Sequence, residues 1–305
     1  MSKVKLWWQA SRPFSFTMSV LPPVFGGLIA AMENPGMELN WLYFSLALIG
    51  CVIAHAGANM IGDYFDFKKQ VDREGTFGSS GVLVSNLIEP GKVFIGAMVA
   101  YVIASGIGIY LAASIPNGLC LILIILVGAV LGLFYAAEPF SFKYHALGDL
   151  AVFISFGPAI TLGAYFVQAH HFSWTPVLYA IPVGFLVDAV LHSNNLRDIK
   201  NDSVVNIKTA AILIGEKNSK FMYYGLVLSA YVSVIVLIIA NGLPVISLIT
   251  LLSFPLALKL IRLVKLKNKV PERQFVMIDA ATAQLHSIFG ILFLISLLVQ
   301  HFVIH

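Results

Sequence analysis

The sequence NMIGDYFDFKKQVD, residues Asn59–Asp72, decides how this chain is interpreted. It follows a long and almost uninterrupted apolar run, and it places Asp63 and Asp66 where that run ends. A second stretch, NNLRDIKND at residues 194–202, ends another apolar run in the same way. Carboxylates are costly near hydrocarbon, so two apolar helices that both end in them indicate a functional site at one face of a membrane.

The composition is that of a polytopic membrane protein. The 305 residues are 59% hydrophobic and 11% charged, with a mean hydropathy of +0.88, whereas a soluble domain is about one-quarter charged. Cys51 and Cys120 both fall in apolar segments, so we expect neither a disulfide nor a cysteine-bound metal. The first apolar run exceeds the roughly 7–15 residues of a signal-peptide core, so we expect an uncleaved first helix.

Windows of about twenty apolar residues predict an all-α membrane protein with about nine transmembrane helices in one bundle. Residues 1–305 would then form a single integral-membrane domain. The predicted spans are residues 14–32, 41–66, 92–114, 117–137, 147–168, 174–195, 219–241, 243–264 and 276–302.

The positive charges predict how the bundle is oriented. All 19 Lys and Arg lie on one side of the nine-span arrangement, and the positive-inside rule makes that side cytoplasmic. The N-terminus would be cytoplasmic and, for an odd number of spans, the C-terminus outside; we expect the cell inner membrane. The basic pI of about 9.0 therefore reports topology. No basic helix or stacking motif indicates a nucleic-acid partner, although the same cations could attract anionic lipid head groups.

The two acidic clusters each occupy one face of a helix that advances about 100° per residue. The first cluster is His55, Asn59, Asp63 and Asp66. The second is Asn195, Asp198 and Asp202, with Asp188 and His192 deeper on the same helix. Oxygen ligands without cysteine suit Mg²⁺, which takes one or two carboxylates and completes its shell with water and substrate phosphates. Two facing clusters would thus hold a diphosphate through bridging metal ions; the alternative is that they are solvated helix ends.

Three cations are placed to meet phosphate oxygens. Arg197 lies inside the second cluster, Lys143 in the loop between the fourth and fifth spans, and Arg12 where the first span enters the membrane. Arg197 is the strongest of the three candidates because its neighbours are proposed metal ligands and arginine suits phosphate geometry. Each of them could instead serve only the positive-inside pattern.

With these two motifs and its spans, the chain resembles the UbiA superfamily of intramembrane prenyltransferases. Within it, the chain is most similar to the 1,4-dihydroxy-2-naphthoate polyprenyltransferases of menaquinone synthesis. The narrower likeness lies in ASRPFSF, GDYFD, LGDLAVFISFG, GAYFVQAH and NNLRDIKND running on to KTAAILIGE.

The resemblance implies an all-helical, UbiA-like bundle with its active site at the cytoplasmic side. There Mg²⁺ would hold a polyprenyl diphosphate, and an aromatic acceptor, 1,4-dihydroxy-2-naphthoate, would be alkylated at carbon. Carried over by residue, the resemblance gives metal or diphosphate ligands at Asn59, Asp63, Asp198 and Asp202, with support from Asp66 and Asp72. Arg197 and Lys143 would contact the diphosphate.

Two questions stay open at the level of sequence. Asp188 and Asp279 lie within apolar spans, which also suits an ion-coupled transporter, although transport sites usually lie near the midplane rather than at one face. Asp188 and His192 are spaced i, i+4, so we expect them to point into the same cavity and to orient the acceptor or take up a proton. The alternative is a buried Asp–His pair that serves only structure.

Overall fold

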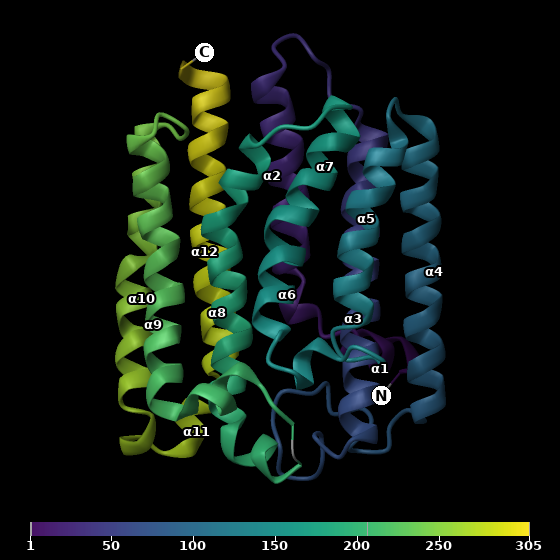
Figure 1. Cartoon of the computed structure of the whole chain (residues 1–305), viewed down its shortest axis with the longest axis vertical. Coiled ribbons are helices and arrows are strands. Elements are labelled where there is room, and N and C mark those ends of the chain that lie inside the picture. The colour runs from purple at the N-terminus through teal and green to yellow at the C-terminus, as the bar shows by residue number, and fades with distance from the viewer. Residues whose placement is uncertain (1, 206, 305) are drawn as a thin grey trace.

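The computed structural model describes residues 2–205 and 207–304, and it is a bundle of roughly parallel helices (Figure 1). The long helices of the first half are α2 (Thr17–Glu33), α3 (Trp41–Lys68), α4 (Pro90–Ser114) and α5 (Gly118–Leu133). In the second half, α6 (Gly148–Ile154) and α7 (Ile160–Ala169) follow each other in one candidate span, Gly148–Ala169. The other long helices are α8 (Thr175–Val204), α9 (Ala210–Ile239), α10 (Phe254–Lys265) and α12 (Ile278–Val299). The short helices are α1 (Lys3–Ala10) and α11 (Glu272–Phe275). The predicted all-α membrane fold is confirmed.

The number of spans is close to the prediction, but nine is not confirmed. Among the described residues, eight helices are long and apolar enough to cross a membrane. The fourth predicted span, 117–137, is the shorter α5, because the helix ends at Leu133. Its 16 residues rise about 24 Å, less than the ~30 Å hydrocarbon core of a bilayer. All of these helices lie in one chain that crosses the membrane several times.

Proline and glycine explain the irregular helices. Pro158 lacks an N–H group, and the chain forms a π-helical turn over Ser155–Ala159 between α6 and α7. Gly157 in that turn meets Gly184 of α8: a Cβ on Gly157 would lie 3.2 Å from the Gly184 Cα atom. Gly215 has a φ of 75° and kinks α9 near its start.

Helix packing forms one large hydrophobic core and several smaller ones. The largest core joins α2, α8, α9 and α12, and includes the fully buried Phe25, Leu186, Tyr223 and Phe289. Smaller cores join α3 to α4 and α5 to α7. The outer faces are apolar: on α4, Ile95, Val99 and Val102 are more than half exposed, as suits contact with lipid.

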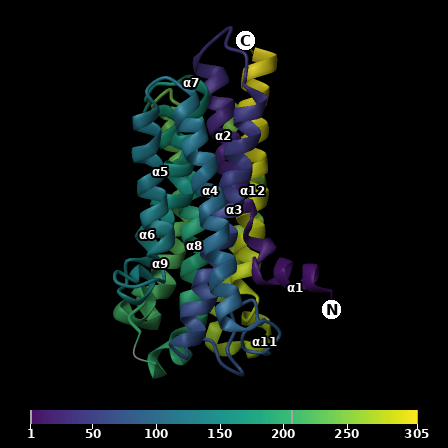
Figure 2. The same ribbon diagram turned by 90° about the vertical axis from the view of Figure 1, so that its right-hand side faces the viewer.

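The two ends of the bundle differ. The N-terminal helix α1 projects sideways from the bundle near the end where α3 and α8 finish, as Figure 2 shows. The C-terminal helix finishes at the opposite end (Figure 1). His305, the residue at which we predict an outside C-terminus, lies beyond the described residues.

Candidate functional site

A cavity of about 360 Å³ lies between α2, α3, α4, α5, α6–α7 and α8. Its lining is polar where α3 and α8 end and apolar farther in. The polar end contains Arg12, Asn59, Asp66, Asp72, Lys143, Asn194, Asp198, Asn201, Asp202 and Asp279. The inner part is lined by small and apolar side chains such as Ala54, Gly108, Leu121 and Val167. The cavity therefore offers charge at one end and an apolar chamber behind it.

The first acidic motif faces a cation and a backbone donor. Asp63 lies 3.6 Å from the Arg12 guanidinium, and its Oδ2 atom accepts a hydrogen bond from the Ser80 backbone N–H at 3.0 Å. The Oδ1 atom of Asp63 and the Nε atom of Arg12 are both buried without a hydrogen-bond partner. Buried polar atoms are usually satisfied, so this pair has capacity left for a ligand.

Asp66 is held one turn farther along α3. Its carboxylate accepts from the Lys143 ammonium and, at 2.8 Å, from the Tyr144 hydroxyl. Burial favours the neutral amine of Lys143, but the nearby Asp66 carboxylate outweighs burial and raises the Lys143 pKa. Lys143 thus stays a cation at the cavity wall, as its proposed contact with a diphosphate requires.

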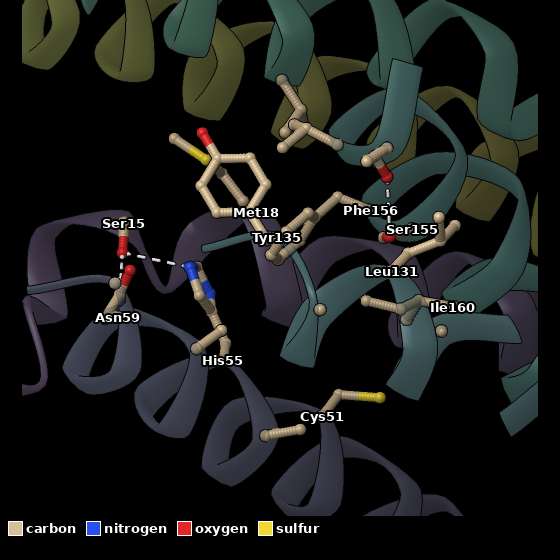
Figure 3. Close-up of a pocket in the computed structure, with 18 of the residues that line it drawn as sticks. Ser15, Met18, Cys51, His55, Asn59, Leu131, Tyr135, Ser155, Phe156 and Ile160 are labelled. Carbon is tan, nitrogen blue, oxygen red and sulfur yellow. Dashed lines mark hydrogen bonds between the residues drawn. The ribbon is translucent and has the colours of Figure 1, made fainter. Parts of the chain in front are cut away.

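Asn59 is oriented by the groups behind it, as Figure 3 shows. Its amide nitrogen donates to the Ser11 carbonyl at 2.9 Å and to the Ser15 hydroxyl at 3.1 Å. The Ser15 hydroxyl also contacts His55, whose other ring nitrogen lies 3.0 Å from the Ser19 hydroxyl. With both amide hydrogens used, the carbonyl oxygen of Asn59 is the atom left to face the cavity. That oxygen is a suitable ligand for a hard cation.

The second acidic motif is built around Arg197. Its Nε and Nη2 atoms donate to the two oxygens of Asp198 at 3.0 and 2.7 Å, a paired geometry that suits carboxylate or phosphate. Asp202 lies one turn farther along α8, is buried, and lines the same cavity. Asn59 and Asp66 of the first motif and Asp198 and Asp202 of the second therefore line one cavity, whereas Asp63 and Arg197 are not among its lining residues.

The loop after α3 closes over the charged end. Asp72 in this loop is buried and lines the cavity. Burial, and then the charge of Asp66, raises the pKa of Asp72 to about 8. The loop is fastened by Arg73, which donates to the Asn201 carbonyl at 3.2 Å. Gly78 packs on the second motif: a Cβ there would lie 2.8 Å from Arg197 Nη2.

Asp188, His192 and Asn195 do not line this cavity, and our expectation for Asp188 and His192 is wrong in this respect. His192 is fully buried and binds Asp149 at 2.8 Å and the Ser219 carbonyl at 3.0 Å. Asp188 lies with Asp149 in a separate recess between α6, α8 and α9. The cavity face of α8 carries Asn194, which is about 100° around the helix from Asn195. The predicted face is therefore split, because Asp198 and Asp202 line the cavity whereas Asp188, His192 and Asn195 do not.

Several lining residues were missed by sequence reasoning. Asn194 precedes Asp198 by four residues, the spacing that also separates Asn59 from Asp63, so this repeat of N-x-x-x-D was a signal that could have found it. Asp279 was noticed only as an intramembrane acid. Gly78 and Tyr135 carry no sequence signal, because their contacts come from the fold.

The charged residues of the cavity suit a metal ion that binds together with its substrate, and not a metal ion bound by the protein alone. In the described part of the chain, no three His, Cys, Asp or Glu side chains converge as a metal site by themselves. Instead, three motif carboxylates are each paired with a cation: Asp63 with Arg12, Asp66 with Lys143 and Asp198 with Arg197. Such pairs can exchange partners when an anion and a metal ion arrive together, because Mg²⁺ completes its shell with phosphate oxygens.

Comparison with known proteins gives concordant results. The UbiA prenyltransferase family model matches residues 20–299. The chain is 31% identical over 297 residues to the 1,4-dihydroxy-2-naphthoate octaprenyltransferase of Bacillus subtilis (strain 168), covering 97% of this chain and 93% of that protein. It is 30% identical to the human UbiA prenyltransferase domain-containing protein 1, covering 95% of this chain and 82% of that protein.

Solved structures share the fold. A UbiA homolog from Archaeoglobus fulgidus bound to DMAPP and Mg²⁺ aligns with a TM-score of 0.63 at 14% identity, over 94% of this chain and 98% of that one. A UbiA homolog from Aeropyrum pernix K1 without ligand aligns with a TM-score of 0.65 at 15% identity, over 90% and 96%.

Proposed function

This chain belongs to the UbiA prenyltransferase family and is a membrane prenyltransferase, and from that premise we propose its substrates and its metal. It transfers a polyprenyl group from a polyprenyl diphosphate to 1,4-dihydroxy-2-naphthoate, with Mg²⁺, at the cytoplasmic face of the cell inner membrane. One observation carries the proposal: two acidic motifs, each paired with cations, meet at the charged end of an apolar cavity. The name of the 31%-identical Bacillus relative supports the acceptor, and the Archaeoglobus structure bound to DMAPP and Mg²⁺ supports the donor class and the metal.

The donor would bind with its diphosphate at the charged end and its tail in the apolar chamber. Asn59, Asp63, Asp66, Asp198 and Asp202 would hold Mg²⁺. The chemistry that Mg²⁺ would supply there is positive charge that stabilises the departing diphosphate. Arg12 and Lys143, now paired with carboxylates, would turn to the phosphate oxygens, and Arg197 would face them from its present position beside Asp279.

The bond changes follow from this placement. The bond between the allylic carbon and the phosphate oxygen breaks, and the electron pair leaves with the diphosphate. A ring carbon of the acceptor supplies the electrons for the new carbon–carbon bond. That carbon then loses a proton if it carried hydrogen, or carbon dioxide if it carried the carboxylate, and the bonding electrons return to the aromatic ring. The apolar lining excludes water, which would otherwise capture the allylic cation.

The test uses the purified full chain in lipid nanodiscs with a polyprenyl diphosphate. Three acceptors are compared: 1,4-dihydroxy-2-naphthoate, a monocyclic hydroxybenzoate and a glycerol phosphate lipid. We expect a prenylated naphthalene product by mass spectrometry, pyrophosphate release, and loss of both when EDTA removes Mg²⁺. Product with another acceptor alone would contradict the acceptor we propose, and undiminished turnover in EDTA would contradict the metal.

A further inference from the structure

Asp279 is a carboxylate of the donor site that belongs to neither acidic motif. It lies in the first turn of α12, more than seventy residues after the second motif, and it lines the charged end of the cavity. Its Oδ1 atom accepts from the Ala280 backbone N–H at 2.8 Å, one of the first-turn N–H groups that have no partner within a helix. Its Oδ2 atom lies 2.8 Å from Arg197 Nη1 and accepts from the Asn194 amide at 3.3 Å.

Arg197 is consequently held between two carboxylates. One edge of its guanidinium binds both oxygens of Asp198. Its Nη1 atom meets Asp279 and donates to the Val276 carbonyl at 2.9 Å. The side chains are nearly inaccessible, with exposed fractions of 6% for Arg197, 9% for Asp198 and 12% for Asp279.

Arg197 also has little room to leave this position. Gly78 of the loop after α3 packs directly on its Nη2 atom, where even a Cβ would lie 2.8 Å away. A buried cation that loses its partner is costly, because it cannot recover its hydration. Any ligand that draws Asp198 away must therefore leave Arg197 with another counter-charge.

We propose that Asp279 is the positioning residue that supplies this counter-charge and so frees Asp198 to bind the metal. This inference rests on the proposed function, in which Asp198 is a ligand of Mg²⁺ bound with the diphosphate. With Asp279 present, Arg197 stays neutralised while Asp198 turns to the cation. Without it, Asp198 would be the sole carboxylate facing Arg197 among those that the structure describes, and the guanidinium would compete with the metal for its oxygens.

The substitution Asp279→Asn isolates the charge. Asparagine has nearly the same shape, and its amide oxygen can accept the same Ala280 N–H, so α12 keeps its first turn. We expect Mg²⁺ affinity, measured by calorimetry on the purified full chain with inorganic pyrophosphate as the probe, to fall about 10- to 100-fold. Asp279→Glu, which restores the charge, should recover most of that loss. Glu216→Gln is the matched control, since it removes a carboxylate from an ion pair with Lys220 at 2.8 Å that lies outside the cavity lining.

A second background shows whether Asp279 acts through Arg197. In Arg197→Gln protein, the additional change Asp279→Asn should leave Mg²⁺ affinity nearly unchanged, because no guanidinium remains to be compensated. A full effect in that background would mean that Asp279 acts on the metal directly and would overturn the inference. So would wild-type affinity in Asp279→Asn protein. If the wild-type protein itself shows no Mg²⁺-dependent binding of pyrophosphate, the proposed function fails instead.

Discussion

Asp63 and Asp198 occupy equivalent places in two different helices. Each follows an asparagine of the cavity wall by four residues, Asn59 in one case and Asn194 in the other. Each also faces an arginine, Arg12 at 3.6 Å and Arg197 at 2.7 Å. The equivalence suggests that the two aspartates do the same work on opposite sides of one ligand.

We therefore expect Asp63→Ala and Asp198→Ala to lower kcat with the polyprenyl donor about a hundredfold or more, since metal stabilisation of departing charge is worth several kcal/mol. Protein should still be recovered folded from the membrane, as judged by gel filtration. Glu89→Ala is a suitable control, because it removes an exposed carboxylate that is paired with Lys92 and is not part of the cavity lining. Turnover within a few-fold of wild type in either aspartate variant would argue against a site shared by two motifs.

Asp188 and His192 do not line the cavity, so we expect substitutions there to leave substrate binding unchanged. Asp188→Asn should leave kcat and the KM of both substrates unchanged. His192→Ala should instead lower stability by about 3–5 kcal/mol, because the buried Asp149 carboxylate loses its partner. Thermal unfolding in detergent and steady-state kinetics separate these effects. A raised acceptor KM in Asp188→Asn protein would restore a role for this pair in acceptor binding.

At the scale of elements, the length of the apolar runs predicted the helices well. The helical advance of about 100° per residue predicted the α3 side of the site but not the α8 side. It placed Asn59 and Asp66 on the cavity face of α3, as the structure does. It could not say which face of α8 meets the cavity, because that depends on the contacts of His192 with Asp149 of α6 and Ser219 of α9. Nor could any local pattern find a loop whose contacts lie far along the chain, such as Ser80 with Gln9 and Arg73 with Asn201.

The loop after α3 is testable through two of its glycines. Gly75 and Gly78 both have positive φ, 83° and 97°, so alanine at either costs about 1–2 kcal/mol of backbone strain. Only at Gly78 does the new Cβ also meet Arg197 and Asn194; at Gly75 no atom lies within 4 Å. We expect Gly78→Ala to raise the donor KM clearly above that of Gly75→Ala. Equal kinetics for the two variants would show that the loop does not position Arg197.

For the whole molecule, the cavity joins two environments that the reaction needs. Its charged end lies where α3 and α8 finish, and its inner end is lined by apolar residues of α4, α5 and α7. The outer surface of the bundle carries exposed apolar side chains such as Val102 and Ile239. One membrane protein can thus bind both the long prenyl tail and the diphosphate head of the same substrate.

The orientation of the bundle decides from which side the diphosphate arrives. The chain begins near the end that carries the acidic motifs and finishes at the opposite end (Figure 1). All 19 Lys and Arg fall on the side that we predict to be cytoplasmic. A reporter inserted in the loop near Glu74 should therefore be active only in the cytoplasm, and one fused after His305 only outside. The pair of fusions also tests whether the short α5, with 16 residues, crosses the membrane. If it did not cross, the number of crossings would be even instead of odd. Both reporters would then be active on the same side, and the nine-span arrangement would be wrong.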